Sequence, residues 1–352
     1  MSLVIYYLSN NSNIISGWAT TRPGWPFPRW PSCTIRTSLL PRYNDPTLLL
    51  NHDDEFGPPM TEFVTLRASQ VLDQGELIRF LKEQFGSSVR VVGKSLPGME
   101  TFEVRIKVPS KEFDSVSDFI RLRRSDGADE FVKYALGSIN RRYTKRDLLN
   151  AELLWATIVP HFEPCGEECG TAYETLCNDC NLGRQVSDLL LDLRRAPQLK
   201  DICETISWIE WIVTSRFKKV VQDNGLSGVE FKPVFDLRSP LASSWMWSQI
   251  QVTGRAGRLA ASVVLGRDPF DTAHFPWRCP NGHSTVTQFL SEICIRESDW
   301  DGSDITITSD LFGEGRNLLR PTPLLLISQK AFRSFEQAGI RGLSYEVARV
   351  ER

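Results

Sequence analysis

The pattern of hydrophobic and polar positions divides the chain into an irregular beginning and a regular remainder. Residues 1–59 show neither helical nor strand periodicity and are rich in Pro, Trp, Asn and Ser. This composition predicts a poorly ordered arm, with a Trp-rich docking arm as the alternative. Met60 opens the first regularly patterned segment, so translation starting there is a second alternative, in which the arm is not made in the cell.

Beyond residue 60 the periodicity predicts a small N-terminal α+β domain over residues 60–148. Apolar residues at helical spacing predict a helix over 76–85. Strand-like runs lie on both sides of it, over 63–66, 89–92 and 102–108. Helical patterning then resumes in three segments, over 116–122, 130–136 and 147–158.

Sliding the chain on itself reveals a further pattern at an offset of 114 residues. Residues 212–231 then lie over residues 326–345, with glycines and apolar positions matched. Each stretch predicts a strand, an amphipathic helix and a second strand. The predicted caps occupy matching places, as helix N-caps Thr214 and Ser328 and as glycine stops Gly225 and Gly339.

Four of the eight cysteines lie close together with a spacing typical of a metal site. They follow the pattern Cys165-x3-Cys169-x7-Cys177-x2-Cys180. Four thiolates form a closed tetrahedral zinc site, which leaves no position for water and is therefore structural. Free or disulfide-paired cysteines are the alternative.

The same offset places Cys279, His283 and Cys294 over three of these cysteines, whereas Ser291 lies over the fourth. Two interpretations remain open for this second set. Either it is a degenerate relic, or it is an open Cys/His zinc position that binds water and performs hydrolysis. We call each set of metal-capable residues a zinc knuckle, the first over residues 165–180 and the second over residues 279–294. The sequence thus predicts an α+β protein whose N-terminal domain is followed by two diverged copies of a zinc-knuckle plus strand-helix-strand unit. The copies are expected over residues 149–238 and 239–352.

Composition narrows the class of partner. The 41 basic and 43 acidic residues give a net charge of −2, so no overall field favours nucleic acid or an anionic membrane. No apolar run approaches the 18 residues of a membrane helix, and the first residues lack the basic region of a signal peptide. We therefore expect a cytoplasmic protein.

The knuckles and the two strand-helix-strand segments resemble bacterial double-CXXCG-motif proteins and related toxin-immunity families. The resemblance covers about residues 150–352 and includes the runs from Thr214 to Val234 and from Ser328 to Val347. The chain departs from the motif in the three residues between its first two cysteines and in Asn181, which replaces a glycine. The resemblance implies a non-enzymatic protein whose partner is a protein, such as a cognate toxin.

Three hypotheses for function follow. The first is an immunity-type or other protein-binding module with structural zinc. The second is a nucleic-acid-binding zinc-ribbon protein, which acidic residues around the first knuckle argue against. The third is a metal-dependent hydrolase or deaminase using Cys279, His283 and Cys294, although no nucleophile is found with its base and the deaminase motif is absent. The acidic residues are Glu163, Glu167, Glu168, Glu174 and Asp179.

Overall fold

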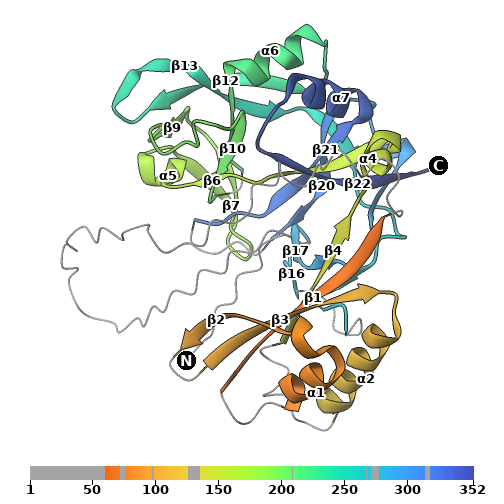
Figure 1. Cartoon of the computed structure of the whole chain (residues 1–352). Coiled ribbons are helices and arrows are strands. Elements are labelled where there is room, and N and C mark those ends of the chain that lie inside the picture. The colour runs from red at the N-terminus through yellow and green to blue at the C-terminus, as the bar shows by residue number, and fades with distance from the viewer. Residues whose placement is uncertain are drawn as a thin grey trace, which may run out of the picture.

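The chain forms an N-terminal unit and a larger body built on two sheets (Figure 1). The computed structural model describes residues 60–71, 76–96, 99–125, 135–207, 209–266, 268–270, 277–313 and 318–352. The arm expected over residues 1–59 lies outside this described part. The α+β class expected from the sequence is confirmed.

The N-terminal unit is a four-stranded antiparallel sheet with two helices on one face (Figure 1). The strands follow the order β2-β3-β1-β4, which is the β-α-β-β-α-β arrangement of ferredoxin-like units. The helix expected over 76–85 is confirmed with those bounds. The elements are β1 Thr61–Val71, α1 Glu76–Phe85, β2 Arg90–Leu96, β3 Met99–Val108, α2 Lys111–Ser125 and β4 Ala135–Arg142.

The first sheet of the larger body has six strands. In order across the sheet they are β6 His161–Phe162, β10 Ile202–Thr205, β11 Trp211–Thr214, β13 Ser239–Val252, β12 Val229–Asp236 and β9 Leu189–Leu191.

The second sheet has eight strands. Seven lie in the order β16 Trp277–Arg278, β17 Ser284–Val286, β20 Ile305–Phe312, β21 Thr322–Ser328, β5 Leu153–Ile158, β22 Leu343–Glu351 and β19 Ile293–Arg296, and β14 Gly254–Gly257 pairs with β20 beside them.

Two small hairpin-like sheets and short helices complete the described structure. The two-stranded sheets pair β7 Tyr173–Cys177 with β8 Leu182–Gln185, and β15 Leu265–Gly266 with β18 Gln288–Phe289. The helices are α4 Lys145–Asn150, α5 Gly166–Cys169, α6 Ser215–Asp223 and α7 Gln329–Ala338, with 3-10 turns at Gly86–Ser88 and Glu297–Asp299. Among the described residues, no helix has the length and apolarity required to cross a membrane.

The helix expected over 147–158 is wrong in its second half. Helix α4 ends at Asn150, and β5 follows as a strand in the middle of the eight-stranded sheet. Five of the six β5 residues are buried, so the strand reads as a continuous apolar run, which periodicity cannot distinguish from a buried helix. The segment expected as a helix over 130–136 is also corrected in part, because Ala135 and Leu136 begin β4, and its remaining residues lie outside the described part.

The strand-helix-strand elements expected on either side of α6 and α7 are confirmed. The Thr214 hydroxyl accepts a hydrogen bond from the backbone N–H of Phe217, and Ser328 caps α7 in the same way. Gly225 and Gly339 follow the helices with φ of 54° and 61°, a left-handed conformation that glycine adopts without a Cβ clash.

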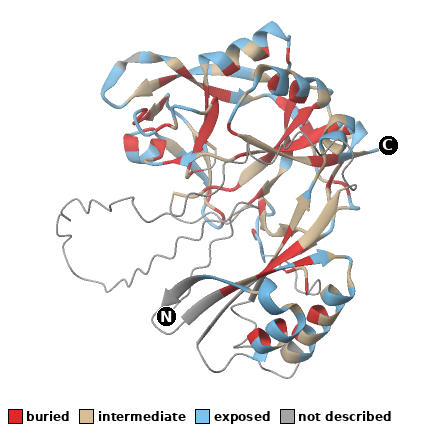
Figure 2. Ribbon diagram, in the orientation of Figure 1, coloured by how far each residue is buried: buried red, intermediate tan, exposed pale blue. Residues whose placement is uncertain are grey.

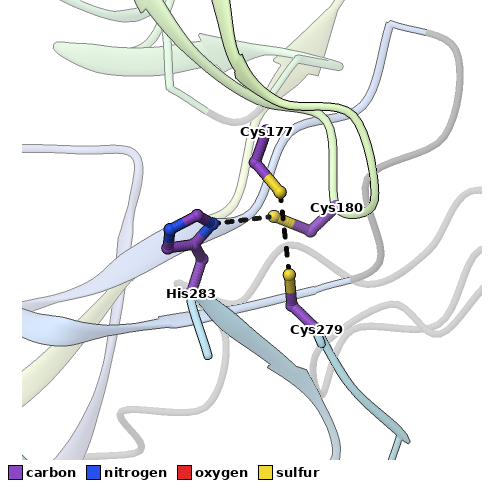
Figure 3. A group of neighbouring side chains, drawn as sticks. All are labelled: Cys177, Cys180, Cys279 and His283. Atoms are coloured by element: carbon purple, nitrogen blue, oxygen red, sulfur yellow. Dashed lines mark hydrogen bonds between the residues drawn. The ribbon is translucent and has the colours of Figure 1, made fainter. Parts of the chain in front are cut away.

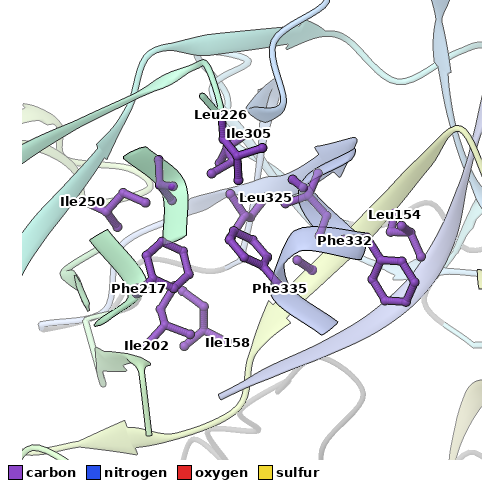
Figure 4. Packing of buried hydrophobic residues seen from close by; sticks show 14 of the residues in the cluster. Leu154, Ile158, Ile202, Phe217, Leu226, Ile250, Ile305, Leu325, Phe332 and Phe335 are labelled. Carbon is purple, nitrogen blue, oxygen red and sulfur yellow. The ribbon is translucent and has the colours of Figure 1, made fainter. Parts of the chain in front are cut away.

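Both sheets contribute to one core in which α6 packs against α7 (Figure 4). The rings of Phe217 and Phe335 lie 4.9 Å apart at this contact. Buried residues of β5, β11 and β21 surround the two helices, and exposed positions lie on the outer faces of the helices (Figure 2). The helices therefore join the two sheets into one body.

We expect replacement of Phe335 by alanine to lower the free energy of unfolding by about 3–5 kcal/mol, because it removes a ring that is 1% exposed and leaves a cavity. Urea denaturation measures the change, with Leu199→Ala, at a side chain 72% exposed, as the matched control. Equal effects of the two substitutions would contradict the assignment of this core.

Candidate metal centre

Two β-turns carry the residues of the candidate site. The first turn connects β7 to β8 and holds Cys177 and Cys180. The second connects β16 to β17 and holds Cys279 and His283. Cys177 and Cys279 have corresponding positions in their hairpins. Each directly precedes the turn and pairs with the first residue of the following strand, Leu182 or Ser284.

Each turn contains one residue in the left-handed region. Asn181 has φ of 53° and lies directly after Cys180, whereas Gly282 has φ of 74° and lies directly before His283. Asparagine tolerates this conformation better than most residues, so Asn181 takes the place that a glycine would otherwise fill. The left-handed residue therefore follows the second ligand in the Cys-x2-Cys turn and precedes it in the Cys-x3-His turn.

The two turns meet and bring four ligand atoms together (Figure 3). The sulfurs of Cys177, Cys180 and Cys279 and a ring nitrogen of His283 all lie within 4.8 Å of one another. The Sγ atoms of Cys177 and Cys279 are 3.8 Å apart, and Cys180 Sγ lies 3.9 Å from His283 Nδ1. The group can therefore hold one metal ion.

These separations agree with tetrahedral coordination. Metal–sulfur bonds of about 2.3 Å at tetrahedral angles place two sulfurs about 3.8 Å apart, and a sulfur and an imidazole nitrogen about 3.6 Å apart. The Cys177–Cys279 separation matches the first value, and the Cys180–His283 separation is a few tenths of an ångström longer than the second.

Asn281 connects the two turns beside the sulfurs. Its side-chain amide donates to Cys177 Sγ at 3.3 Å and to the Asp179 carboxylate at 2.8 Å. The hydrogen bond from Asn281 to Cys177, together with one from the backbone of Cys180, lowers the pKa of the Cys177 thiol to about 6. Burial raises the pKa of Cys180 to about 11, which favours the protonated thiol in the absence of metal. The positive charge of a bound cation would favour the thiolate.

The three cysteines are buried and the histidine is exposed. Together with Leu182, the thiols form a small cluster of their own, separate from the main core. A ligand set of this kind leaves the imidazole as the only part of the site that faces solvent among these four residues.

The grouping expected from the sequence is corrected by this arrangement. Cys165 and Cys169 lie outside the cluster. Cys177 and Cys180 are joined instead by Cys279 and His283 of the second turn. Cys165 is the N-cap of α5, where its backbone N–H donates to the Glu168 carboxylate. Burial raises the pKa of Cys165 to about 11 and also raises that of Cys169.

The second expected set, Cys279, His283 and Cys294, is also divided. Cys294 lies on β19, where its thiol contacts the carbonyl of Ile295 at 3.7 Å. Ser291 accepts a hydrogen bond from the backbone of Val264 and donates to the carbonyl of Glu292. In the part of the chain that the structure describes, one group of His, Cys and acidic residues is arranged to hold a metal.

Most of the acidic residues around the first knuckle have partners within the protein. Glu167 pairs with Arg320, Glu174 pairs with Arg184, and Asp179 accepts from Asn281. Ion pairs thus offset the charges of Glu167 and Glu174, and a hydrogen bond connects Asp179 to the second turn.

Sequence reasoning failed to pair the two turns because their residues are about a hundred positions apart along the chain. A usable signal was present nonetheless. Cys177-x2-Cys180 and Cys279-x3-His283 are both short ligand pairs next to residues that form turns, and each pair supplies half of a tetrahedral set.

The structure also reveals a buried carboxylate that no sequence motif marks. Glu204 on β10 lies 3.2 Å from His161 Nδ1 on β6 and accepts a hydrogen bond from the Trp211 indole at 2.8 Å. Burial raises the pKa of Glu204 despite these two partners. The carboxylate on β10 is thus bound by side chains of the two neighbouring strands, β6 and β11.

No model of a known protein family matches this sequence, and no curated protein matches it. The resemblance to double-CXXCG-motif and toxin-immunity proteins therefore remains a prediction.

We expect separate substitution of Cys177, Cys180, Cys279 or His283 to abolish stoichiometric metal binding. Cys165→Ser and Cys169→Ala should leave it intact, because these thiols lie outside the cluster. Metal analysis by mass spectrometry after gel filtration checks this, with circular dichroism to confirm folding. Loss of metal on replacing Cys165 or Cys169 in a folded chain would contradict the grouping.

A second expectation concerns Glu204 and pH. Because its pKa is raised in the folded state, the folded chain binds this proton more tightly than the unfolded chain does. Its contribution to stability is complete below the usual glutamate pKa of about 4.3 and is lost as pH rises through the raised value. Glu204→Gln should therefore gain stability relative to the natural chain as pH rises, as followed by urea denaturation between pH 5 and 8. Parallel stability curves would contradict this.

Proposed function

We propose that the protein binds one zinc ion at Cys177, Cys180, Cys279 and His283, and that this zinc is structural. The observation that carries the proposal is the meeting of two ligand-bearing turns, with the four ligand atoms within 4.8 Å of one another. Each turn alone supplies two ligands, so only the folded chain assembles the set.

The chemistry of the ligands favours zinc over other common cations. Three thiolates and one imidazole form a soft, tetrahedral donor set, which suits zinc and does not suit calcium or magnesium. The 3.8 Å separation of Cys177 and Cys279 supports the same geometry.

The ligand count argues for a structural role. Catalytic zinc sites have three protein ligands and keep a fourth position for water. Here Cys177 and Cys180 lie where an open site at Cys279 and His283 would keep a position for water. The proposal is therefore a non-enzymatic protein, and the hydrolase or deaminase alternative loses the open site on which it rested.

The nucleic-acid alternative finds no support on the first hairpin. Glu174 and Asp179 lie on the first hairpin, and an acidic hairpin repels phosphate. The basic side chain there, Arg184, is paired with Glu174 at 2.5 Å.

For the cellular role, we propose an immunity-type protein that binds and neutralises a partner toxin. This part is supported by the resemblance of the knuckle and strand-helix-strand segments to double-CXXCG-motif and toxin-immunity proteins. Electrostatic attraction of a basic toxin by the acidic residues near the first cysteines is not part of this proposal, because Glu167 is paired with Arg320 and the Glu168 carboxylate accepts from the Cys165 backbone. Charge reversal at Glu167 or Glu168 would disturb the fold as well as the surface.

A native mass spectrum of the untagged protein, expressed with its neighbouring genes, tests both parts separately. We expect one zinc per chain and a retained neighbour-encoded protein, which should also protect cells when the two genes are expressed together. Zero or two zinc ions per chain would contradict the metal assignment. One zinc without any partner or protection would contradict the immunity role alone.

A further inference from the structure

The two sheets of the larger body have the same plan. In each, a central strand lies between the strand that precedes a helix and the strand that follows it, antiparallel to both. The central strand is β13 in the six-stranded sheet and β5 in the eight-stranded sheet. The outer strands also correspond in direction, β10 to β20, β9 to β19, and β6 to β14.

The register of the strands agrees on one side of the central strand. Thr214, the N-cap of α6, pairs with Trp247 of β13. Ser328, the N-cap of α7, pairs with Leu153 of β5. Trp247 and Leu153 are therefore equivalent positions.

The register agrees on the other side as well. Phe231 of β12 pairs with Ile250, which lies three residues beyond Trp247. Tyr345 of β22 pairs with Ala156, which lies three residues beyond Leu153. A slip of one residue in either sheet would break this agreement, so the two sheets match residue by residue around their central strands.

A buried carboxylate anchors each half to the other. Asp201 accepts a hydrogen bond from the Thr214 hydroxyl at 3.2 Å, in its own half. It also accepts from the backbone N–H of Arg341 at 3.0 Å, in the turn after α7, which belongs to the other half. The Arg216 guanidinium lies 3.1 Å from the same carboxylate.

Asp304 makes the reciprocal set of contacts. It accepts from the Ser328 hydroxyl at 2.7 Å and from the backbone N–H of Ser227 at 3.0 Å, in the turn after α6. Lys330, at the helix position equivalent to that of Arg216, lies 3.4 Å from this carboxylate. Contacts that run in both directions between equivalent residues are the signature of an isologous, twofold interface.

The glycines of the same two turns are also reciprocal. Gly228 and Gly342 have φ of 89° and 117°. A Cβ at Gly228 would overlap the carbonyl oxygen of Ile305, and a Cβ at Gly342 would overlap that of Ile202. The backbone of each half thus approaches the other at the same place.

The axis relating the halves passes through the metal centre. Asp179 and Asn281 each lie two residues after the first cysteine of their turn, and they hydrogen-bond to each other at 2.8 Å. Two equivalent residues contact each other directly only near the twofold axis. Cys177 and Cys279, which are also equivalent, lie 3.8 Å apart beside them.

We propose that residues 153–352 are two copies of one unit, related by a pseudo-twofold axis through the metal centre, that have exchanged their first strands. β5, the first strand of the first copy, is the central strand of the second copy's sheet, and β13 is the central strand of the first copy's sheet. Neither copy has a complete sheet without the other. The metal is then an additional link between two copies that the exchanged strands already hold together.

The inference depends on contacts between protein atoms, so it stands or falls separately from zinc binding. To test it, a protease site is inserted between Leu237 and Arg238, at the turn joining β12 to β13, in the full-length chain. The folded protein is then cleaved and examined by gel filtration with light scattering, with and without a chelator. The uncut insertion variant, compared with the natural chain by denaturation midpoint, is the control for folding.

Strand exchange predicts that the two fragments remain one particle under both conditions, because each contributes the central strand of the other's sheet. Separation before chelation would overturn the exchange. Separation only after chelation would also overturn it, since the metal would then be the sole tie. Zinc content of the uncut protein reports on the metal assignment independently.

Equivalence of the copies is tested by Asp201→Asn and Asp304→Asn. Each removes one half of a reciprocal anchor, so both should lower the denaturation midpoint by similar amounts. Asp223→Asn, which alters an exposed ion pair with Lys219, should leave the midpoint unchanged. A large shift from one anchor and none from the other, or no shift from either, would overturn the equivalence.

Discussion

The contact between α6 and α7 is the constraint on which the larger body depends. Phe217 and Phe335 meet there at 4.9 Å, and the core around them draws residues from both sheets. The two helices fix the sheets relative to each other, and the second ligand-bearing turn, between β16 and β17, belongs to the eight-stranded sheet. Cys177 and Cys279 are more than 100 residues apart along the chain, so the ligand atoms meet only in the folded protein.

The candidate metal centre lies in a region that has little apolar packing of its own. The thiols of Cys177, Cys180 and Cys279 form the local cluster there with Leu182. Coordination bonds replace a hydrophobic core in such loop-rich segments. Asn281 adds a hydrogen bond to Cys177 and another to Asp179, which orients the first turn and favours its thiolate.

Local features of the fold were predictable from the sequence, whereas its long-range pairings were not. Helix α1 and the caps of α6 and α7 follow from spacing and from Thr214, Ser328 and the glycine stops, all of which act within a few residues. Strand β5 was mistaken for helix because burial on both faces removes the alternation that identifies a strand. Neither its place between β21 and β22 nor the partner of Cys177 is encoded in nearby residues.

The cysteine grouping shows the same limit. A constant offset of 114 residues aligned Cys165 with Cys279, but that offset holds only around the two helices. The strands before them differ in length and spacing, so under the proposed twofold relation the equivalent of Cys279 is Cys177. Cys165 and Cys169 lie at the N-cap of α5 and within it, outside the cluster of four ligands, although they are close in sequence to Cys177.

X-ray absorption at the zinc edge of the purified full-length protein tests the central claim most directly, because it counts the ligand atoms of a single site. The account predicts three sulfurs at about 2.3 Å and one imidazole nitrogen at about 2.0–2.1 Å. A shell of four sulfurs, which would bring back Cys165 or Cys169, or a shell of oxygen and nitrogen alone, would contradict it.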